Sequence, residues 1–157
     1  MPLADIKARI KAQLELVAGI GKVHASTRMV KDESLTLADL VLGGVLNAWM
    51  ISRETIALKD ESVNQASTEQ KDFIAVHGYY AVKDSVSEPI FDNLVDAVLA
   101  QLNTDRRPVN GGGTLLNATV KAANAPQVTE NDYRMFGPEQ ALCHHVKIVL
   151  PVVRGYI

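Results

Sequence analysis

Two stretches in which the side chains alternate with a period of two residues constrain the fold of this chain more than any other feature. Residues 49–56 and 73–80 each divide into two alternating sets of side chains, as they do in a β-strand, where successive side chains point to opposite faces of a sheet. Between them lies a polar run from Lys59 to Lys71, which is typical of an exposed turn region. The sequence therefore predicts a β-hairpin with a long polar tip near residues 59–71.

Helical periodicity flanks this hairpin on both sides. A first helix is predicted from near Leu3 to Ala18, with Gly19 as its stop. A later helix is predicted to follow Ser87 as N-cap, and its apolar stripe consists of Phe91, Leu94, Val95, Val98 and Leu102. A short helix is also predicted around Leu37, Leu40, Val41, Val45 and Leu46, although the glycines at 43 and 44 each cost it about 1 kcal/mol relative to alanine.

Three further strands complete the predicted fold. They are expected near residues 22–26, 127–136 and 144–153. Because Pro151 cannot donate a hydrogen bond to a neighbouring strand, the last strand is predicted to lie at a sheet edge or to end there. A long connection containing glycine and proline is expected near residues 103–126. The order of elements predicts an α+β fold in a single domain over residues 1–157, with about three helices packed on a mostly antiparallel sheet of four to five strands.

Composition excludes several classes of function. Sixteen basic and eighteen acidic residues leave a net charge of −2, which is too balanced for a protein that neutralises many phosphates or binds anionic membranes through charge. No segment offers the ~20 apolar residues of a membrane span, and the start of the chain mixes charge into its apolar residues, unlike a secretory signal. The single cysteine, Cys143, cannot form an internal disulfide. We therefore expect a soluble protein made in a reducing cytoplasm.

No motif in the sequence predicts a catalytic centre. Gly19-Ile20-Gly21-Lys22 lacks the glycine spacing of a phosphate loop and has Val23 where that loop needs Ser or Thr, so it is interpreted as a helix stop and a turn. Nothing resembles the local signature of a serine nucleophile, and Cys143 is interpreted as a small buried hydrophobe. The expectation is a protein that is not an enzyme, with no catalytic, cofactor-binding or metal-binding residues.

A metal site is the chemical alternative that stays open. Cys143, His144 and His145 are adjacent, but strand alternation would point His144 away from the other two. A site would therefore need Cys143 and His145 to meet His24 or His77 through the fold. Spaced pairs such as CxxC or HExxH, which make metal sites recognisable from sequence, are absent.

Two polar segments are the candidate interfaces with other subunits. The first is the loop in which Arg106-Arg107 is followed by Gly111-Gly112-Gly113. Such a basic and glycine-rich loop can wrap phosphates through its backbone N–H groups, or it can be an arm that orders on meeting another subunit. The balanced net charge of the whole sequence favours the second. The hairpin tip is the other predicted contact region. The candidate interface residues are Glu61, Asn64, Gln65, Glu69, Arg106, Arg107, Gly111, Gly112 and Gly113.

Five segments form an ordered series over about residues 6 to 150, and none carries a catalytic signature. They are Gly19-Ile20-Gly21-Lys22-Val23-His24, Ala48-Trp49-Met50-Ile51-Ser52-Arg53, His77-Gly78-Tyr79-Tyr80, Ser87-Glu88 leading into Phe91 and Leu94-Val95, and Phe136-Gly137 before Leu142-Cys143-His144-His145. In this order they resemble segments of tailed-bacteriophage tail terminator proteins, which are similar in role to the phage lambda tail terminator. Between Asn103 and Ala125 this sequence is longer and richer in glycine than the resemblance leads us to expect.

The resemblance implies a structural virion protein without a cofactor. Such a protein forms a homohexameric ring that caps the tail tube and joins it to the head connector or adaptor protein, while genomic DNA passes through the channel unread. It would be assembled in the host cytoplasm and reside in the tail and neck of the virion. The alternatives are a head completion or connector-adaptor protein of the same neck and, from another class, a small metal-binding protein or enzyme.

Overall fold

The structure is a computed structural model that describes most of the chain, with two helices and seven strands among the described residues. The residues described are 3–26, 41–42, 45–60, 68–83, 85–104, 120–122, 125–136 and 141–156. The elements are α1 (Leu3–Leu14), β1 (Lys22–His24), β2 (Val41–Leu42), β3 (Val45–Asp60), β4 (Thr68–Ala81), α3 (Ser87–Thr104), β5 (Val120–Ala122), β6 (Gln127–Phe136) and β7 (Ala141–Tyr156).

All seven strands belong to one mixed sheet. Its path runs β1-β3-β4-β7-β5, while β2 pairs with β3 and β6 pairs with β7. The pairing of β1 with β3 is parallel, and every other pair is antiparallel. The predicted α+β fold with a mostly antiparallel sheet is confirmed, and the parallel pair makes the sheet mixed.

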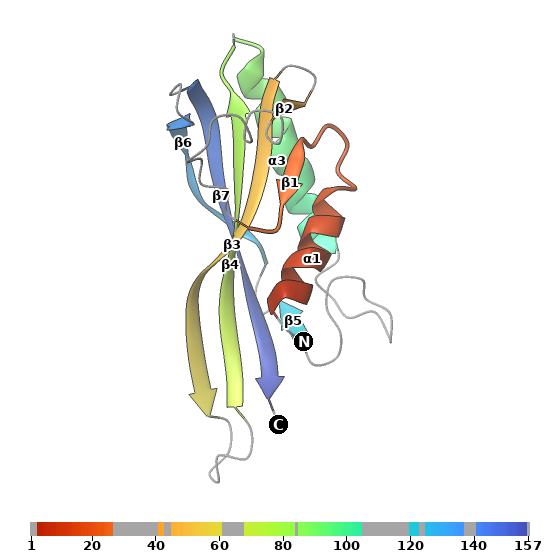
Figure 1. Cartoon of the computed structure of the whole chain (residues 1–157), viewed down its shortest axis with the longest axis vertical. Coiled ribbons are helices and arrows are strands. Elements are labelled where there is room, and N and C mark those ends of the chain that lie inside the picture. Colours follow the sequence, from red (N-terminus) through yellow and green to blue (C-terminus); the bar gives the residue numbers. More distant parts are fainter. Residues whose placement is uncertain are drawn as a thin grey trace.

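The two helices cover one face of the sheet. Figure 1 shows α1 and α3 on the same side of the long strands, and Gln101 of α3 donates a hydrogen bond of 2.7 Å to Gln13 of α1. Trp49 and Ile51 are fully buried beneath them. The remaining members of this core include Ile6, Ile10, Leu14, Ile74, Val76, Phe91, Val98, Leu102, Val146 and Ile148. The stripe predicted for the later helix is therefore the surface that α3 buries.

Three strands extend further in space than the helices that pack on them. Strands β3, β4 and β7 have 16, 14 and 16 residues, and in Figure 1 they run on past the helices toward the C-terminus. Their mutually paired residues 55–60, 68–73 and 151–156 make up a segment that we call the three-stranded arm. The predicted hairpin is confirmed, but its strands reach Asp60 and start at Thr68, inside the predicted tip.

The helix predicted around Leu37 to Leu46 is wrong where the structure describes it. Val41 and Leu42 form β2 and pair antiparallel with Leu46 and Val45 of β3, while residues 37 and 40 lie outside the described residues. The apolar spacing there fits a helix as well as a strand, and pairing with β3 decides in favour of the strand. The described part of the chain thus has two of the three predicted helices.

The placement predicted for Pro151 is also wrong. Strand β7 is interior, with β4 on one side and both β5 and β6 on the other. The pairing with β6 ends at Val149 and the pairing with β5 starts at Val152, so Pro151 lies at the break between them. A residue without an amide hydrogen is tolerated at such a break. Strand β5 itself falls within the connection predicted near 103–126.

Candidate functional site

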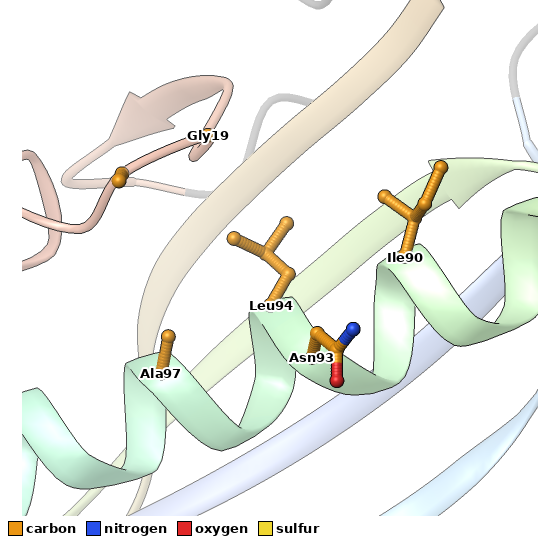
Figure 2. A pocket seen from close by; sticks show the side chains of 6 residues that line it. Gly19, Ile90, Asn93, Leu94 and Ala97 are labelled. Atoms are coloured by element: carbon orange, nitrogen blue, oxygen red, sulfur yellow. The ribbon is translucent and has the colours of Figure 1, made fainter.

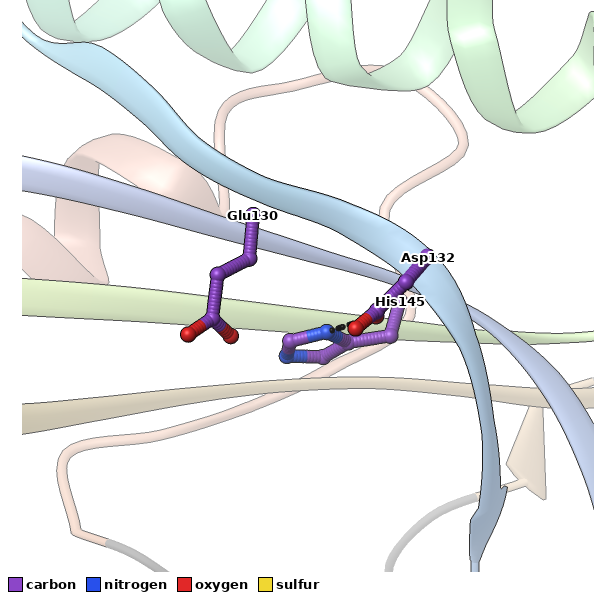
Figure 3. Close-up of side chains that lie close together, drawn as sticks. All are labelled: Glu130, Asp132 and His145. Carbon is purple, nitrogen blue, oxygen red and sulfur yellow. Dashed lines mark hydrogen bonds and ion pairs between the residues drawn. The ribbon is translucent and has the colours of Figure 1, made fainter.

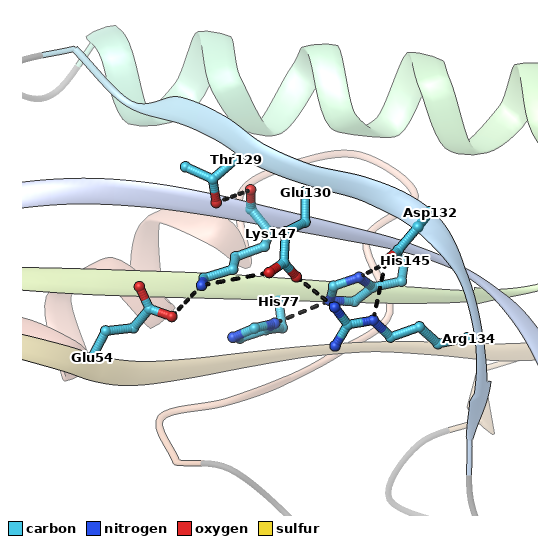
Figure 4. Close-up of polar contacts among 8 residues, drawn as sticks. All are labelled: Glu54, His77, Thr129, Glu130, Asp132, Arg134, His145 and Lys147. Carbon is cyan, nitrogen blue, oxygen red and sulfur yellow. Dashed lines mark hydrogen bonds and ion pairs between the residues drawn. The ribbon is translucent and has the colours of Figure 1, made fainter.

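A group of charged and histidine side chains lies on the sheet face opposite the helices, and we call it the polar cluster. Strand alternation selects its members, because Trp49 and Val146 point to the helices while their neighbours point away. The register places Asp132 of β6 beside His145 of β7, and Glu130 beside Lys147. Figure 4 shows the cluster on the side of the sheet away from α3. Its members are Glu54, His77, Glu130, Asp132, Arg134, His145 and Lys147.

Two histidines and one carboxylate form a chain of contacts at its centre. Nδ1 of His145 lies 2.7 Å from Oδ1 of Asp132, and Nε2 of His145 lies 3.1 Å from Nδ1 of His77. The two imidazole rings are stacked, with centroids 5.4 Å apart. The His145 side chain is fully buried, whereas that of Asp132 is 46% exposed. This chain of contacts thus leads from the protein surface to a buried imidazole.

Two cations pair with the carboxylates of the cluster. Arg134 lies 2.6 Å from Glu130 and 3.3 Å from Asp132. Lys147 contacts Glu54 and lies 3.9 Å from Glu130. Each of the three carboxylates therefore has a cationic partner within the same sheet face.

The environment shifts the acid–base equilibria of the cluster. Burial, and then the positive charge that His145 and Lys147 can place nearby, lower the pKa of His77 below its usual 6.5. Burial also lowers the pKa of His145, although its hydrogen bond to Asp132 opposes that effect. Desolvation raises the pKa of Asp132, but the hydrogen bond from His145 and the charge of Arg134 outweigh it and leave that pKa below its usual value. Both imidazoles are consequently neutral at pH 7.

Glu130, Asp132 and His145 have the spacing of a metal-ligand set. Figure 3 shows the three side chains beside one another, and their ligand atoms lie within 4.8 Å of one another. Two carboxylates with one imidazole suit a divalent cation such as Zn²⁺ or Mn²⁺. Arg134 already bridges both carboxylates, and the proton on Nδ1 of His145 lies against Asp132. An incoming cation would have to displace both, so the observed arrangement is an ion-paired network.

The sequence-predicted metal set is brought together only in part. Contact between His77 and His145 is observed, and His144 points to the opposite face, where its Nε2 lies 3.1 Å from the hydroxyl of Ser87. Strand β3 separates β1 from β4, so His24 and His77 are not neighbours. The metal-like group among the described residues contains neither Cys143 nor His24.

Cys143 is a poor candidate for a nucleophile. Its side chain is buried, and burial raises the pKa of the thiol to about 11. Because the thiolate is the reactive form, a thiol that stays protonated at neutral pH attacks electrophiles slowly. The interpretation of Cys143 as a small buried hydrophobe agrees with this environment.

A shallow pocket lies between the turn that follows α1 and one side of α3. Figure 2 shows its lining, which has a single polar side chain, Asn93. Its volume of about 240 Å³ is below the ~300–1,000 Å³ of typical small-molecule sites. The pocket therefore offers little chemistry for a ligand. The lining residues are Ala18, Gly19, Ile90, Asn93, Leu94 and Ala97.

Most of the predicted interface residues lie outside the described part of the chain. Glu69 lies in β4, in register with Lys59 of β3 and Gly155 of β7. The others, Glu61, Asn64, Gln65, Arg106, Arg107, Gly111, Gly112 and Gly113, fall outside the described residues. The carboxylates and cations of the polar cluster, in contrast, were missed from the sequence. The signal available was the i, i+2 spacing of Glu130, Asp132 and Arg134 in a predicted strand.

The chain matches no protein-family model and no curated protein. Among the helices that the structure describes, none is long and apolar enough to cross a membrane.

Proposed function

We propose that this chain is a structural subunit of a tailed-bacteriophage neck, a tail terminator whose homohexameric ring caps the tail tube and joins it to the head connector. The observation that carries the proposal is the three-stranded arm. Strands usually have about 5–6 residues, whereas β3 and β7 have 16 each and span roughly 50 Å at 3.4 Å per residue. Strands this long extend past the helices and can reach a neighbouring subunit.

The open edge of the sheet also supports a role in assembly. No strand of the described residues pairs with the outer side of β6, and large apolar side chains are exposed on β6 and beside it. Edge strands with apolar side chains readily contact other chains. The exposed residues are Val128, Tyr133 and Met135 of β6, with Leu142 of β7.

Close packing at two glycines supports a structural role for the segments that resemble the terminator family. A Cβ atom on Gly21 would lie 1.8 Å from the carbonyl oxygen of Asn47, and one on Gly78 would lie 2.6 Å from the ring of Trp49. These segments therefore meet one another in the fold. Residues with such contacts specify a scaffold, which is what a ring subunit requires.

The ring places demands on the surface of each subunit. A head-to-tail contact uses two different patches and closes only when the rotation between neighbours divides the circle. We assign one patch to the tip of the three-stranded arm and the other to the edge of the sheet at β6. The net charge of −2 fits a channel that DNA passes without being read, in a particle assembled in the host cytoplasm.

Native mass spectrometry and negative-stain electron microscopy test this proposal directly. The purified chain, alone or mixed with its tail tube, is expected to form rings with six-fold symmetry that sit on tube ends. Monomers alone under both conditions would contradict the proposal. A head completion or connector-adaptor protein is the nearest alternative, and labelled chain bound to tail-less heads would favour it.

A metal-binding protein or enzyme is the second candidate, favoured by the contact between His77 and His145. Metal analysis of the purified wild type, His145→Ala and Cys143→Ala separates it from the first. Stoichiometric metal in the wild type that His145→Ala abolishes would favour this candidate. A metal-free wild type that still forms rings would favour the structural role.

A further inference from the structure

The chain of contacts from Asp132 through His145 to His77 is not used by the proposed structural function. It is nevertheless built from groups that can exchange protons, and its central ring is fully buried. The inference that follows concerns the chain of contacts alone and holds whether or not the protein forms a ring.

Geometry determines where the protons lie when both imidazoles are neutral. The Asp132 carboxylate can only accept a hydrogen bond, so Nδ1 of His145, 2.7 Å away, carries the proton. Nε2 of His145 is then an acceptor, and Nδ1 of His77, 3.1 Å away, must carry the proton of that contact. Both rings are therefore held in the Nδ1–H form, with Nε2 of His77 left unprotonated.

The three linked side chains of Asp132, His145 and His77 can take up one proton without losing a hydrogen bond. A proton added to Nε2 of His77 makes that ring an imidazolium that still donates from Nδ1 to His145. A second proton has to bind Nε2 of His145, where it would face the N–H of His77 across 3.1 Å. Two donors at that distance repel each other, so the second proton opens the contact between the rings.

The second proton makes the net charge of the polar cluster positive. Three carboxylates and two cations leave the cluster with one net negative charge while both histidines are neutral. Two imidazolium groups reverse this to one net positive charge. Among the described residues, the titratable groups that face the two rings are Glu54 of β3, Tyr79 of β4, Glu130, Asp132 and Arg134 of β6, and Cys143 and Lys147 of β7.

We propose that Asp132, His145 and His77 form a proton-operated switch on this face of the sheet. With no proton or one proton added, the rings stay in contact and β4 is joined to β6 through His145. With two protons added, the ion pair between His145 and Asp132 persists, while His77 withdraws and the cluster becomes positive. The face presented by β4, β6 and β7 therefore changes both its shape and its charge as the solution is acidified.

Imidazole NMR of the full chain tests the switch. Long-range ¹H–¹⁵N spectra at neutral pH are expected to show His77 and His145 in the Nδ1–H form, in contrast to the Nε2–H form that free histidine favours. Titration toward acid is expected to show coupled protonation, because each ring resists a proton on the other. His145→Gln should therefore shift the midpoint of His77 upward, and His77→Gln should shift that of His145 upward.

Three matched variants control the experiment. Asp132→Ala should release His145 from the Nδ1–H form, whereas Asp96→Ala, on the exposed side of α3, should not. His24→Gln should leave both midpoints unchanged because β3 lies between β1 and β4. Circular dichroism verifies that each variant is folded. The proposal is overturned if folded wild type shows the Nε2–H form in either ring, or if the two midpoints are independent of each other.

Discussion

At the scale of single residues, two glycines determine how closely the strands and turns of this fold approach. Gly78 lies under the six-membered ring of Trp49, and Gly21 lies against the backbone of Asn47. Asn47 completes the arrangement, because it donates to the carbonyl of Gly19 at 3.0 Å and accepts from the indole N–H of Trp49 at 3.1 Å. Gly19, with a φ of +81°, ends the turn that follows α1. The end of α1 is thus joined to the centre of the sheet.

Gly78→Ala is expected to destabilise the protein by about 1–3 kcal/mol, the usual cost of an extra methyl group in a packed core. The new Cβ would lie 2.6 Å from the Trp49 ring, which is fully buried. Urea denaturation measures the loss. Trp49→Phe provides the control, since a smaller ring should make the same alanine cheaper. Strictly additive free energies in the double variant would show that the two residues do not clash.

At the scale of elements, alternation along the strands decides which side chains work together. Strand β7 shows this most clearly, because His144 packs under α3 against Phe91 while His145 faces the polar cluster. That opposition was predicted from the sequence. For His145, the sequence offered His77 only as one of two possible partners, and the contact with His77 is observed. The other partners, Asp132, Ser87 and Phe91, were not predicted, because β6 and α3 take their positions beside β7 through contacts between distant segments.

The free energy of unfolding should fall as the solution is acidified below about pH 6.5, the ordinary pKa of histidine. Burial lowers the pKa of both His77 and His145 in the folded state, so the unfolded chain binds protons first. Their contribution to stability is complete above pH 6.5 and is lost as the pH falls through the folded-state values. Urea denaturation across this range measures the slope.

The matched control is the double variant His77→Gln and His145→Gln. It should show a flatter dependence of stability on pH than the wild type, because neither side chain titrates in this range. An equally steep dependence in the double variant would assign the effect to other groups.

At the scale of the whole molecule, the structure has two parts. At one end the helices pack on the sheet, and from there the three-stranded arm extends. The core beneath α1 and α3 contains the large buried side chains, including Trp49, Phe91 and Ile148. The arm continues the same three strands beyond it (Figure 1). We propose that the contacts used in assembly form at the far end of the arm. The predicted interface residues Glu61, Asn64 and Gln65 follow Asp60 in the sequence and lie outside the described residues.

Replacement of residues 61–67 by Asn-Gly should abolish ring formation and leave the subunit folded. Asp60 and Thr68 are directly paired, so a two-residue turn of this type can close the hairpin without disturbing the strands. Native mass spectrometry measures the rings, and thermal denaturation verifies the fold. The double variant Arg106→Ala and Arg107→Ala tests the other predicted contact loop separately. Rings formed at wild-type yield by the shortened hairpin would place the contact elsewhere.

The sequence by itself determined the local structure: the first helix, although α1 ends at Leu14 and the predicted helix at Ala18, the stripe of α3, the hairpin and the strand at residues 127–136. Each depends on periodicity or on a stop residue within a few positions, which a single segment carries. Tertiary structure alone decided that residues 41–46 are strands, that β7 is interior despite Pro151, and that Asp132, His145 and His77 meet. These outcomes depend on pairing between segments far apart in the chain, and the energy of such pairing is absent from any local pattern.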